Sequence, residues 1–328
     1  MTLGSSLTTP PPTLSLPEAL TLAKAHFGLT GQLSPLTSER DLNFRLTTPE
    51  GSFVLKLANT AEPAEVTQFQ TLALIHLEAS ALPVPRVIRT LQGGTEAATQ
   101  HGILRLLSWV EGQPQHLSPR SPGQCVAMAT IAARLSLGLQ GFHHKAATHV
   151  LQWDIKQASA LRPLLRFIAP DLRALATETL DRFDTDLKPR LGTCRAQVIH
   201  NDLNPHNVLV DPQDPDRITG ILDFGDMVET PLICDAAVTA AYQLDPARPN
   251  DSLTIFARAY HAVLPLTVPE LGLLRDLTAT RMLTTLAVAS ARAARYPGNA
   301  PYILRNVPAA AAGLAALAAA PRLPLEVT

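Results

Sequence analysis

The chain has 328 residues, of which 46% are hydrophobic, so it can bury a substantial core and is expected to fold as two lobes. Its formal net charge of -1 excludes the broad basic surface with which proteins bind nucleic acid or anionic membranes. Its three cysteines are widely spaced and follow no metal-ligand pattern, which fits a reducing compartment. We therefore expect a cytoplasmic protein with no nucleic-acid or membrane partner, and the oligomeric state stays open.

The first hundred residues predict a small antiparallel sheet with two helices. Residues 1–14 are rich in Ser, Thr and Pro and are expected to be disordered. A helix is expected to begin after the cap Ser15 and to end at Gly28, and a longer one covers Glu62–Ala81. The predicted strands are Gly31–Leu36, Asn43–Thr47, Ser52–Ala58, Arg86–Leu91 and Gly102–Leu107.

From residue 121 onward, apolar residues recur with helical spacing. The predicted helices cover 121–144, 156–188, 232–243, 249–264, 268–296 and 302–319. Short β segments interrupt them at Ala196–Ile199 with Val208–Val210, and at Ile218–Leu222. This pattern predicts an α+β protein with a β-rich N-lobe over residues 15–109, a hinge over 110–120 and a mainly helical C-lobe over 121–328.

The most informative stretch runs from Val198 to Asp226, where two short apolar strands each end in polar side chains. Phosphoryl transfer needs a carboxylate that accepts the proton of the attacking hydroxyl, and oxygen ligands that hold Mg²⁺ against the phosphates. His200-x-Asp202-x-x-x-x-Asn207 and Asp223-Phe224-Gly225 match both signatures of kinases. The alternative is that these Asp and Asn residues only cap turns. His200 is expected to hold the loop rather than to carry a proton.

A lysine at position 56 lies inside the strand Phe53–Leu57. Burying an ammonium group is costly unless an anion is near, and in a kinase that anion is the nucleotide phosphate. Glu65 on the following helix is the expected partner of Lys56, with Gln70 and Glu62 as alternatives. The other interpretation is a lysine that snorkels from an edge strand.

Two further segments could contact a nucleotide. The turn that holds Ser38 contains no Gly-x-Gly-x-x-Gly, so backbone amides and Ser38 are expected to cover the phosphates. An ordinary surface hairpin is the alternative. Ser108 and Trp109 lie where the last strand enters the hinge, where an adenine would bind, although Trp109 could equally be a core residue.

Together these motifs resemble the aminoglycoside phosphotransferase/choline kinase superfamily, and within it hydroxylysine kinase and its bacterial relatives. The resemblance spans residues 17–305. It rests on Ser38–Phe44, Val54–Lys56, Trp109–Gly112, Gly141–His144, Trp153–Asp154, His200–Asn207, Leu222–Asp226, Asp235 and Pro297–Asn299.

The resemblance implies a bilobal protein-kinase-like fold, ATP or GTP with Mg²⁺, and transfer to a hydroxyl of a small, usually amine-bearing molecule. It implies that Asp202 is the catalytic base, that Asn207 and Asp223 hold magnesium, and that Lys56 binds nucleotide phosphate. Asp235 is expected to cap a helix. One departure is Asn201, which stands where the family has glycine; asparagine tolerates left-handed backbone better than most residues.

The acceptor is less well defined. Asp154, Asp226 and Glu229 are candidates for binding a cationic group, and Arg281 for binding a carboxylate. The leading hypothesis is a small-molecule kinase acting on hydroxylysine or another amino alcohol or hydroxy amino acid. The alternatives are an aminoglycoside, homoserine or choline phosphotransferase and a non-catalytic nucleotide-binding pseudokinase. A protein kinase ranks last, because the chain lacks Ala-Pro-Glu and an activation segment.

Overall fold

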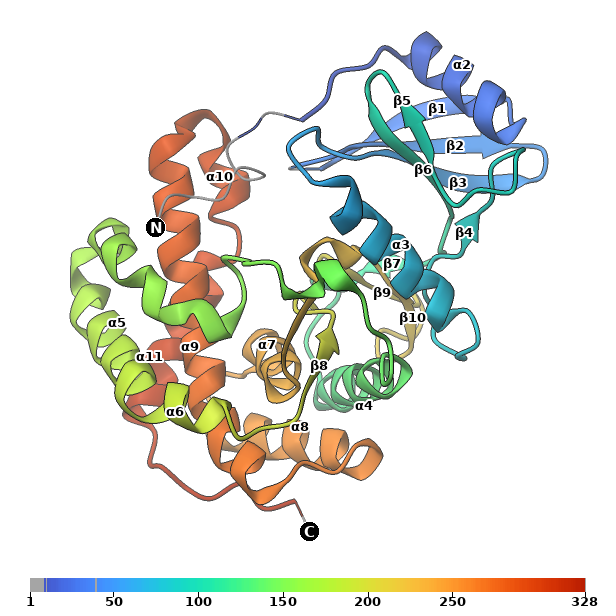
Figure 1. The fold of residues 1–328 in the computed structure, drawn as a ribbon. Coiled ribbons are helices and arrows are strands. Elements are labelled where there is room, and N and C mark those ends of the chain that lie inside the picture. Colours follow the sequence, from blue (N-terminus) through green and yellow to red (C-terminus); the bar gives the residue numbers. More distant parts are fainter. Residues whose placement is uncertain (1–8, 10, 39, 328) are drawn as a thin grey trace.

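The computed structural model describes residues 9, 11–38 and 40–327. An antiparallel N-terminal sheet is followed by a mainly helical part, which confirms the predicted α+β fold (Figure 1). Of the segment expected to be disordered, residues 1–8 and 10 lie outside the described residues. Residues 11–14 have no regular secondary structure.

The N-terminal sheet has the strand order β1-β2-β3-β6-β4, with β5 also paired to β6, and every pairing is antiparallel. The expected strand over 86–91 is shorter than predicted, and β5 was not predicted. The strands are β1 Gln32–Leu36, β2 Leu42–Thr48, β3 Gly51–Leu57, β4 Val87–Ile88, β5 Ala97–Thr99 and β6 Gly102–Ser108.

Helix α2 (Leu16–Phe27) covers one face of this sheet (Figure 1). As predicted, Ser15 caps it, forming a capping box with Glu18, and Gly28 ends it with a left-handed φ of 72°. The apolar side of α2 packs on strand residues such as Leu55 and forms a small core with them. The opposite face of β3 and β6 is turned toward the rest of the protein.

Helix α3 (Ala64–Leu77) lies on that opposite face but packs mainly with the helical part. The Phe69 ring centroid lies 5.9 Å from that of Phe142 and 5.5 Å from that of His144. Glu65 forms an ion pair with Lys145 in the same segment. The Gly141–His144 motif therefore joins α3 to the helical core.

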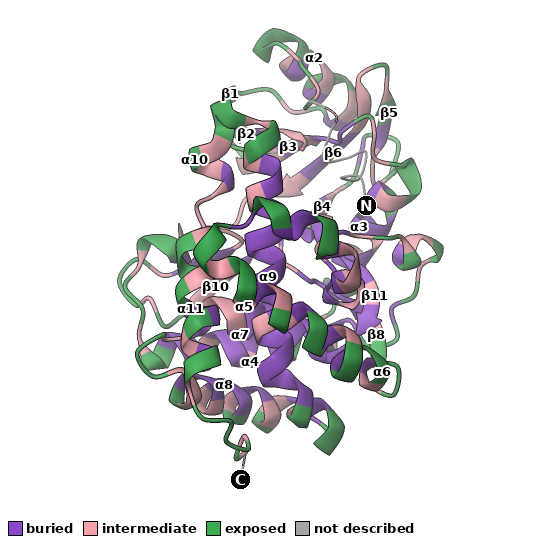
Figure 2. Ribbon diagram, turned by 90° about the vertical axis from the view of Figure 1, so that its left-hand side faces the viewer, coloured by how far each residue is buried: buried purple, intermediate pink, exposed green. Residues whose placement is uncertain are grey.

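The helical part is built around the long helix α9, most of which is buried (Figure 2). One expected helix, 156–188, is instead a 3-10 helix, an α-helix and a π turn. Pro163 lies inside the 3-10 helix, where it cannot donate an α-helical hydrogen bond, and the chain breaks just before Pro170, which begins the α-helix. The helices longer than ten residues are α4 Pro122–Gly138, η3 Ile155–Phe167, α5 Pro170–Arg182, α7 Ile233–Gln243, α8 Pro249–Val263, α9 Val268–Arg295 and α11 Val307–Ala319. The shorter ones are η1 Gln115–Leu117, η2 Lys145–Thr148, η4 Phe183–Leu187, α6 Lys188–Leu191, η5 Phe224–Asp226, η6 Pro297–Asn299 and α10 Ala300–Ile303.

Two small antiparallel sheets lie among these helices. One has the order β10-β9-β7 and the other pairs β11 with β8; β7 and β11 were not predicted. The kinase-like loop 200–207 connects β8 to β9, and Asp223 follows β10. The strands are β7 Gln113–Pro114, β8 Ala196–Ile199, β9 Val208–Val210, β10 Ile218–Ile221 and β11 Val228–Pro231.

Within the described part of the chain, no single helix is long and apolar enough to cross a membrane. Pro297–Ile303 and Val307–Ala319 reach that length and hydropathy only when taken together, across a bend of 54°.

Candidate active site

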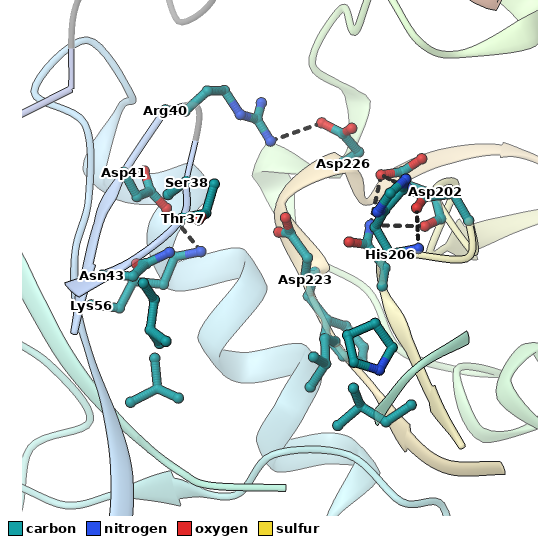
Figure 3. Close-up of a pocket in the computed structure, with 18 of the residues that line it drawn as sticks. Thr37, Ser38, Arg40, Asp41, Asn43, Lys56, Asp202, His206, Asp223 and Asp226 are labelled. Atoms are coloured by element: carbon teal, nitrogen blue, oxygen red, sulfur yellow. Dashed lines mark hydrogen bonds and ion pairs between the residues drawn. The ribbon is translucent and has the colours of Figure 1, made fainter. Parts of the chain in front are cut away.

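A cavity of about 780 Å³ lies between the N-terminal sheet and the helical part. Its described lining includes Ser38 and Lys56 from the sheet side, and Asp202, Asn207 and Asp223 from the helical side. Figure 3 shows Asp223 between Lys56 and Asp202. These residues lie far apart in the sequence, and their motifs predict a role in one reaction. In the structure they line one cavity.

The Asp202 carboxylate is held by three side-chain donors. Its Oδ2 accepts from Asn204 Nδ2 at 2.9 Å and from Asn207 Nδ2 at 2.8 Å. Its Oδ1 accepts from Arg281 Nη2 at 2.9 Å. Burial raises the pKa of Asp202, and Arg281 opposes this shift. The Asp202 carboxylate therefore has both the raised proton affinity that a base needs and a fixed orientation toward the cavity.

Arg281 comes from α9 and is itself 2% exposed. Its Nη1 donates to the Trp153 carbonyl at 3.1 Å and its Nη2 also to Tyr242 Oη at 3.3 Å. The guanidinium lies over the rings of Trp153 and Tyr242. The residue expected to bind an acceptor carboxylate is therefore the counter-ion of Asp202.

The backbone of the loop is fixed at Asn201. This residue has a left-handed φ of 65°, as expected for an asparagine in the place of a glycine. Its amide donates to Asp235 Oδ1 at 2.8 Å. Asp235 lies in the first turn of α7, but the residue that caps this helix is Leu232. The expected helix cap instead anchors the loop, and burial raises its pKa to about 6.

His200 has the structural role expected of it. Its Nδ1 accepts from the Asp202 amide at 3.2 Å, so the other nitrogen, Nε2, carries the proton and donates to the Leu222 carbonyl at 3.1 Å. Burial lowers the pKa of His200, which favours this neutral form. The ring thus ties the Asp202 loop to the strand that precedes Asp223.

Asp223 has a left-handed φ of 57°, and its Oδ1 accepts from the Gly225 amide at 3.1 Å. Burial by itself would raise the pKa of Asp223, but Lys56 and Arg40 outweigh it and the pKa is lowered. A Cβ at Gly225 would lie 2.7 Å from Arg40 Nη2 and 2.9 Å from Asp223 Oδ1, so a larger residue here would displace one of these side chains.

Asp223 and Asn207 offer oxygen atoms suited to a hard cation. Asn207 uses Nδ2 to bond Asp202, so its Oδ1 is the atom left for a ligand role. Carboxylate and amide oxygens are the protein ligands of Mg²⁺, which takes further ligands from phosphate and water. These two residues fit a magnesium bound together with a nucleotide.

The partner of Lys56 differs from the prediction. Its Nζ lies 2.8 Å from Asp41 Oδ2, whereas Glu65 pairs with Lys145 and Gln70 bonds Arg105 and Glu62. The reason is register: Asn43 stands opposite Lys56, so the carboxylate just before β2 reaches the ammonium group. Burial alone would lower the pKa of Lys56, but Asp41 and Asp223 raise it, and the side chain stays charged.

Arg105 is a cavity residue that the motifs missed. It stands opposite Lys56 on β6, is 2% exposed, and donates to Gln70 Oε1 at 3.0 Å. The signal was present in the sequence, because an arginine in the apolar strand Gly102–Ser108 is as costly as the lysine that drew attention to β3.

An ion pair crosses the cavity above this site. Arg40 Nη2, from the turn before β2, lies 2.9 Å from Asp226 Oδ1, which follows the Asp-Phe-Gly segment (Figure 3). Asp226, expected to contact an acceptor, is thus the counter-ion of Arg40. Ser38 lies in the same turn and lines the cavity as expected.

Ser108 and Trp109 line the cavity where β6 ends and the segment 110–120 begins. Ser108 Oγ accepts from the Arg86 amide at 2.8 Å, and the Trp109 ring lies under the Arg45 guanidinium at 4.2 Å. Apolar side chains from both parts line the cavity as well, which suits a planar base. They include Leu36, Val54, Leu107, Val110, Leu209 and Leu222.

Two expected acceptor residues are not part of the described cavity lining. Asp154 is 1% exposed, caps η3 through the Lys156 amide at 3.0 Å and accepts from Thr230 Oγ1 at 2.9 Å. Glu229 belongs to β11, and its carbonyl accepts from Lys156 Nζ. The structure thus places Asp154 at a buried helix start and Glu229 in a strand pair, and neither among the described residues that line the cavity.

Several known proteins are similar to this chain. Hydroxylysine kinase of Mus musculus is 25% identical over 89% of this chain and 86% of its own length. Homoserine kinase of Rhodopseudomonas palustris is 27% identical over 60% of this chain and 58% of its own length.

Among solved structures, an amicoumacin kinase matches with a TM-score of 0.66 at 13% identity, over 90% of this chain and 93% of that one. A microcompartment-associated aminopropanol kinase matches with a TM-score of 0.63 at 16% identity, over 90% and 94%. The model of the phosphotransferase enzyme family matches residues 32–275, which is most of the chain. The protein is therefore a kinase of the phosphotransferase enzyme family.

Proposed function

We propose that the chain transfers the γ-phosphoryl group of ATP to a hydroxyl of a small amine-bearing molecule, with hydroxylysine or a related hydroxy amino acid as the acceptor. The observation that carries this is the shared cavity onto which Lys56, Asp223 and Asp202 open. Residues 15–109 would bind the nucleotide, 110–120 would be the hinge, and 121–328 would supply the base and the acceptor site.

On the nucleotide side, Lys56 would bind the phosphates while Asp41 keeps it charged and oriented. Ser38 and the turn around it would cover the phosphates. The apolar walls near Ser108 and Trp109 would enclose the base.

Asn207 and Asp223 would hold Mg²⁺. Held by these two residues, the metal would supply positive charge for the transferring phosphoryl group. The lowered pKa of Asp223 keeps its carboxylate ionised and ready for this role.

Asp202 would accept the proton of the acceptor hydroxyl while the hydroxyl oxygen forms the new bond to phosphorus. The bond between the γ-phosphorus and the bridging oxygen breaks, and ADP leaves with the released electron pair. Asn204, Asn207 and Arg281 fix the carboxylate, so catalysis rests on positioning and on charge stabilisation.

Support for the acceptor class comes from the relatives named as hydroxylysine kinases, which match over nearly the whole chain. The homoserine kinase match is shorter but concerns another hydroxy amino acid. A pseudokinase is disfavoured, because a scaffold without activity has no need to keep the base and both metal ligands in one cavity.

The test is an ADP-release assay with Mg·ATP over hydroxylysine, homoserine, ethanolamine, choline and kanamycin. We expect turnover with a hydroxy amino acid, and its loss by ~10²–10⁴-fold in D202N and further in D223N. D211N, in the exposed turn after β9, is the matched control and should keep wild-type rates. Nucleotide binding without turnover of any acceptor would instead favour the pseudokinase.

A further inference from the structure

The ion pair between Arg40 and Asp226 joins the two sides of the cavity. Arg40 belongs to the turn before β2 on the sheet side, and Asp226 belongs to η5 on the helical side. Both side chains are largely buried, with exposed fractions of 20% and 11%. Figure 3 shows Arg40 reaching over Lys56 and Asp223 toward Asp226. A ligand that occupies both sides of the cavity therefore meets this pair.

The other acidic residues that line the described cavity are held from their own side. Asp41 pairs with Lys56 across one hairpin, and three side chains of the helical part hold Asp202. Asp223 accepts a hydrogen bond from the backbone of its own turn. Asp226 differs, because its counter-ion comes from the opposite side and contacts it through one atom of each side chain. Of these carboxylates, Asp226 is the one that can most readily exchange its partner for a ligand.

Arg40 also lies where the nucleotide phosphates are proposed to bind. Its carbonyl accepts from Asn59 Nδ2 at 2.8 Å, which fixes the backbone of the turn while the side chain lines the cavity. Its Nη2 and Asp223 Oδ1 flank the same backbone position, Gly225. A guanidinium group can bond two phosphate oxygens at once, which is a stronger contact than its single bond to Asp226.

We propose that Asp226 binds an ammonium group of the acceptor, and that Arg40 occupies this place until the nucleotide phosphates draw its guanidinium away. The acceptor then replaces Arg40 as the counter-ion of Asp226. This inference rests on the proposed function, because it takes the phosphates to lie between Lys56 and Asp223. We call Arg40 and Asp226 the exchange pair. It makes tight binding of the acceptor depend on bound nucleotide.

The exchange pair also selects which amine of the acceptor is bound. Asp226 and Asp202 both line the cavity from its helical side, and Figure 3 shows them on the same side of Asp223. With the reacting hydroxyl at Asp202, an ammonium group that reaches Asp226 has to lie close to that hydroxyl. In hydroxylysine this is the amine on the carbon next to the hydroxyl, whereas the α-amine lies further along the chain.

The test measures acceptor binding with and without nucleotide. Hydroxylysine is titrated calorimetrically into the free protein, into the protein saturated with Mg²⁺ and a non-hydrolysable ATP analogue, and into the protein saturated with AMP. We expect the ATP analogue to raise the affinity ~10–100-fold, the range of one hydrogen bond between charged groups. AMP lacks the β- and γ-phosphates and should leave the affinity unchanged.

Two variants separate the members of the exchange pair. R40Q exposes the Asp226 carboxylate, so without nucleotide it should bind hydroxylysine about tenfold more tightly than the wild type does. The ATP analogue should then add little. D226N should bind hydroxylysine about tenfold more weakly than the wild type when the analogue is present. R89Q is the matched control, because Arg89 is an exposed arginine just after β4 and is not part of the described lining; it should keep the wild-type affinities.

A second acceptor tests the choice of amine. 2-Amino-5-hydroxyhexanoic acid differs from hydroxylysine only in lacking the amine next to the hydroxyl. Its affinity should change little between the free and the analogue-bound wild type. This comparison needs no substitution, so it decides the question even if R40Q or D226N loses its melting transition.

The exchange pair would be overturned if the wild type bound hydroxylysine equally with and without the ATP analogue, or if both acceptors responded equally to it. A folded R40Q that binds hydroxylysine no better than the free wild type would have the same meaning. The proposed function fails separately. Nucleotide-dependent binding through Arg40 and Asp226 without ADP release would leave the exchange pair standing and refute phosphoryl transfer to this acceptor.

Discussion

The two sides of the cavity stabilise their reactive charges in opposite ways. On the sheet side, the cation Lys56 is held by Asp41, a carboxylate next to the neighbouring strand. On the helical side, the carboxylate Asp202 is held by Arg281, which follows it by 79 residues. The first pair depends on one hairpin, whereas the second depends on the packing of the whole helical core. Acceptor chemistry should therefore be more sensitive to the C-terminal fold than nucleotide binding is.

The largest expected effect concerns the buried charge behind the Asp202 loop. Asp235 has a folded pKa of about 6 against an ordinary value of 3.8, so the folded state binds its proton more tightly. The stabilisation of the fold by protonated Asp235 is complete below about pH 4 and is lost as the pH rises through about 6. D235N carries no charge, so between pH 4 and pH 8 the wild type should lose roughly 3 kcal/mol of stability relative to it.

Denaturant titration of both proteins at several pH values measures this difference. The contribution of the other titrating groups cancels, because the two proteins share them. A stability difference that stays constant from pH 4 to pH 8 would contradict the raised pKa of Asp235.

The next effect concerns Arg281. R281Q removes the cation that stabilises ionised Asp202, so the pKa of that carboxyl should rise further. The acid limb of the pH profile of kcat/KM should move to higher pH, and kcat should fall roughly 30-fold because the carboxylate also loses its orientation.

A full pH–rate profile separates the rise in the pKa of Asp202 from the loss of its orientation. R281K keeps a positive charge beside Asp202, so its acid limb should lie between those of the wild type and R281Q. A profile that keeps its acid limb in place, with only a lower plateau, would show that Arg281 orients Asp202 without influencing its proton affinity.

A smaller effect should appear on the sheet side. D41N removes the counter-ion of Lys56, and the KM for ATP should rise about tenfold, as expected for the loss of one hydrogen bond to a charged group. E65Q is the control. Glu65 pairs with Lys145 in an exposed position, and such pairs contribute little.

Steady-state kinetics at varied ATP and saturating acceptor compares the two variants. A larger effect of E65Q than of D41N would mean that Lys56 exchanges partners when the nucleotide binds. The hairpin would then not be the source of its orientation.

Much of the fold could be predicted because its signals are local. The cap Ser15, the terminator Gly28 and the turn Thr48–Gly51 mark the first helix and a hairpin, and the structure confirms them. The prediction of one continuous helix over 156–188 was wrong, because it followed the helical spacing of the apolar residues and disregarded Pro163 and Pro170. The two-residue strand β7 carries too few residues to form a pattern.

The candidate site divides in the same way. Asp202, Asn207 and Asp223 could be named because each lies in a short motif, whereas their partners depend on tertiary packing. Asp41 is found at Lys56 only through the strand register, and Arg281 at Asp202 only through the placement of α9.

Helix α3 has a consequence for motion. It lies against the sheet, but Phe69 and Glu65 attach it to the segment around Phe142 and Lys145. Arg105 of β6 also bonds Gln70 of α3, so this helix is tied to both the sheet and the helical part. Because α3 stands between β3 and β4 in the chain, any rocking of the sheet over α3 would have to bend both of its connections to the sheet, residues 58–63 and 78–86.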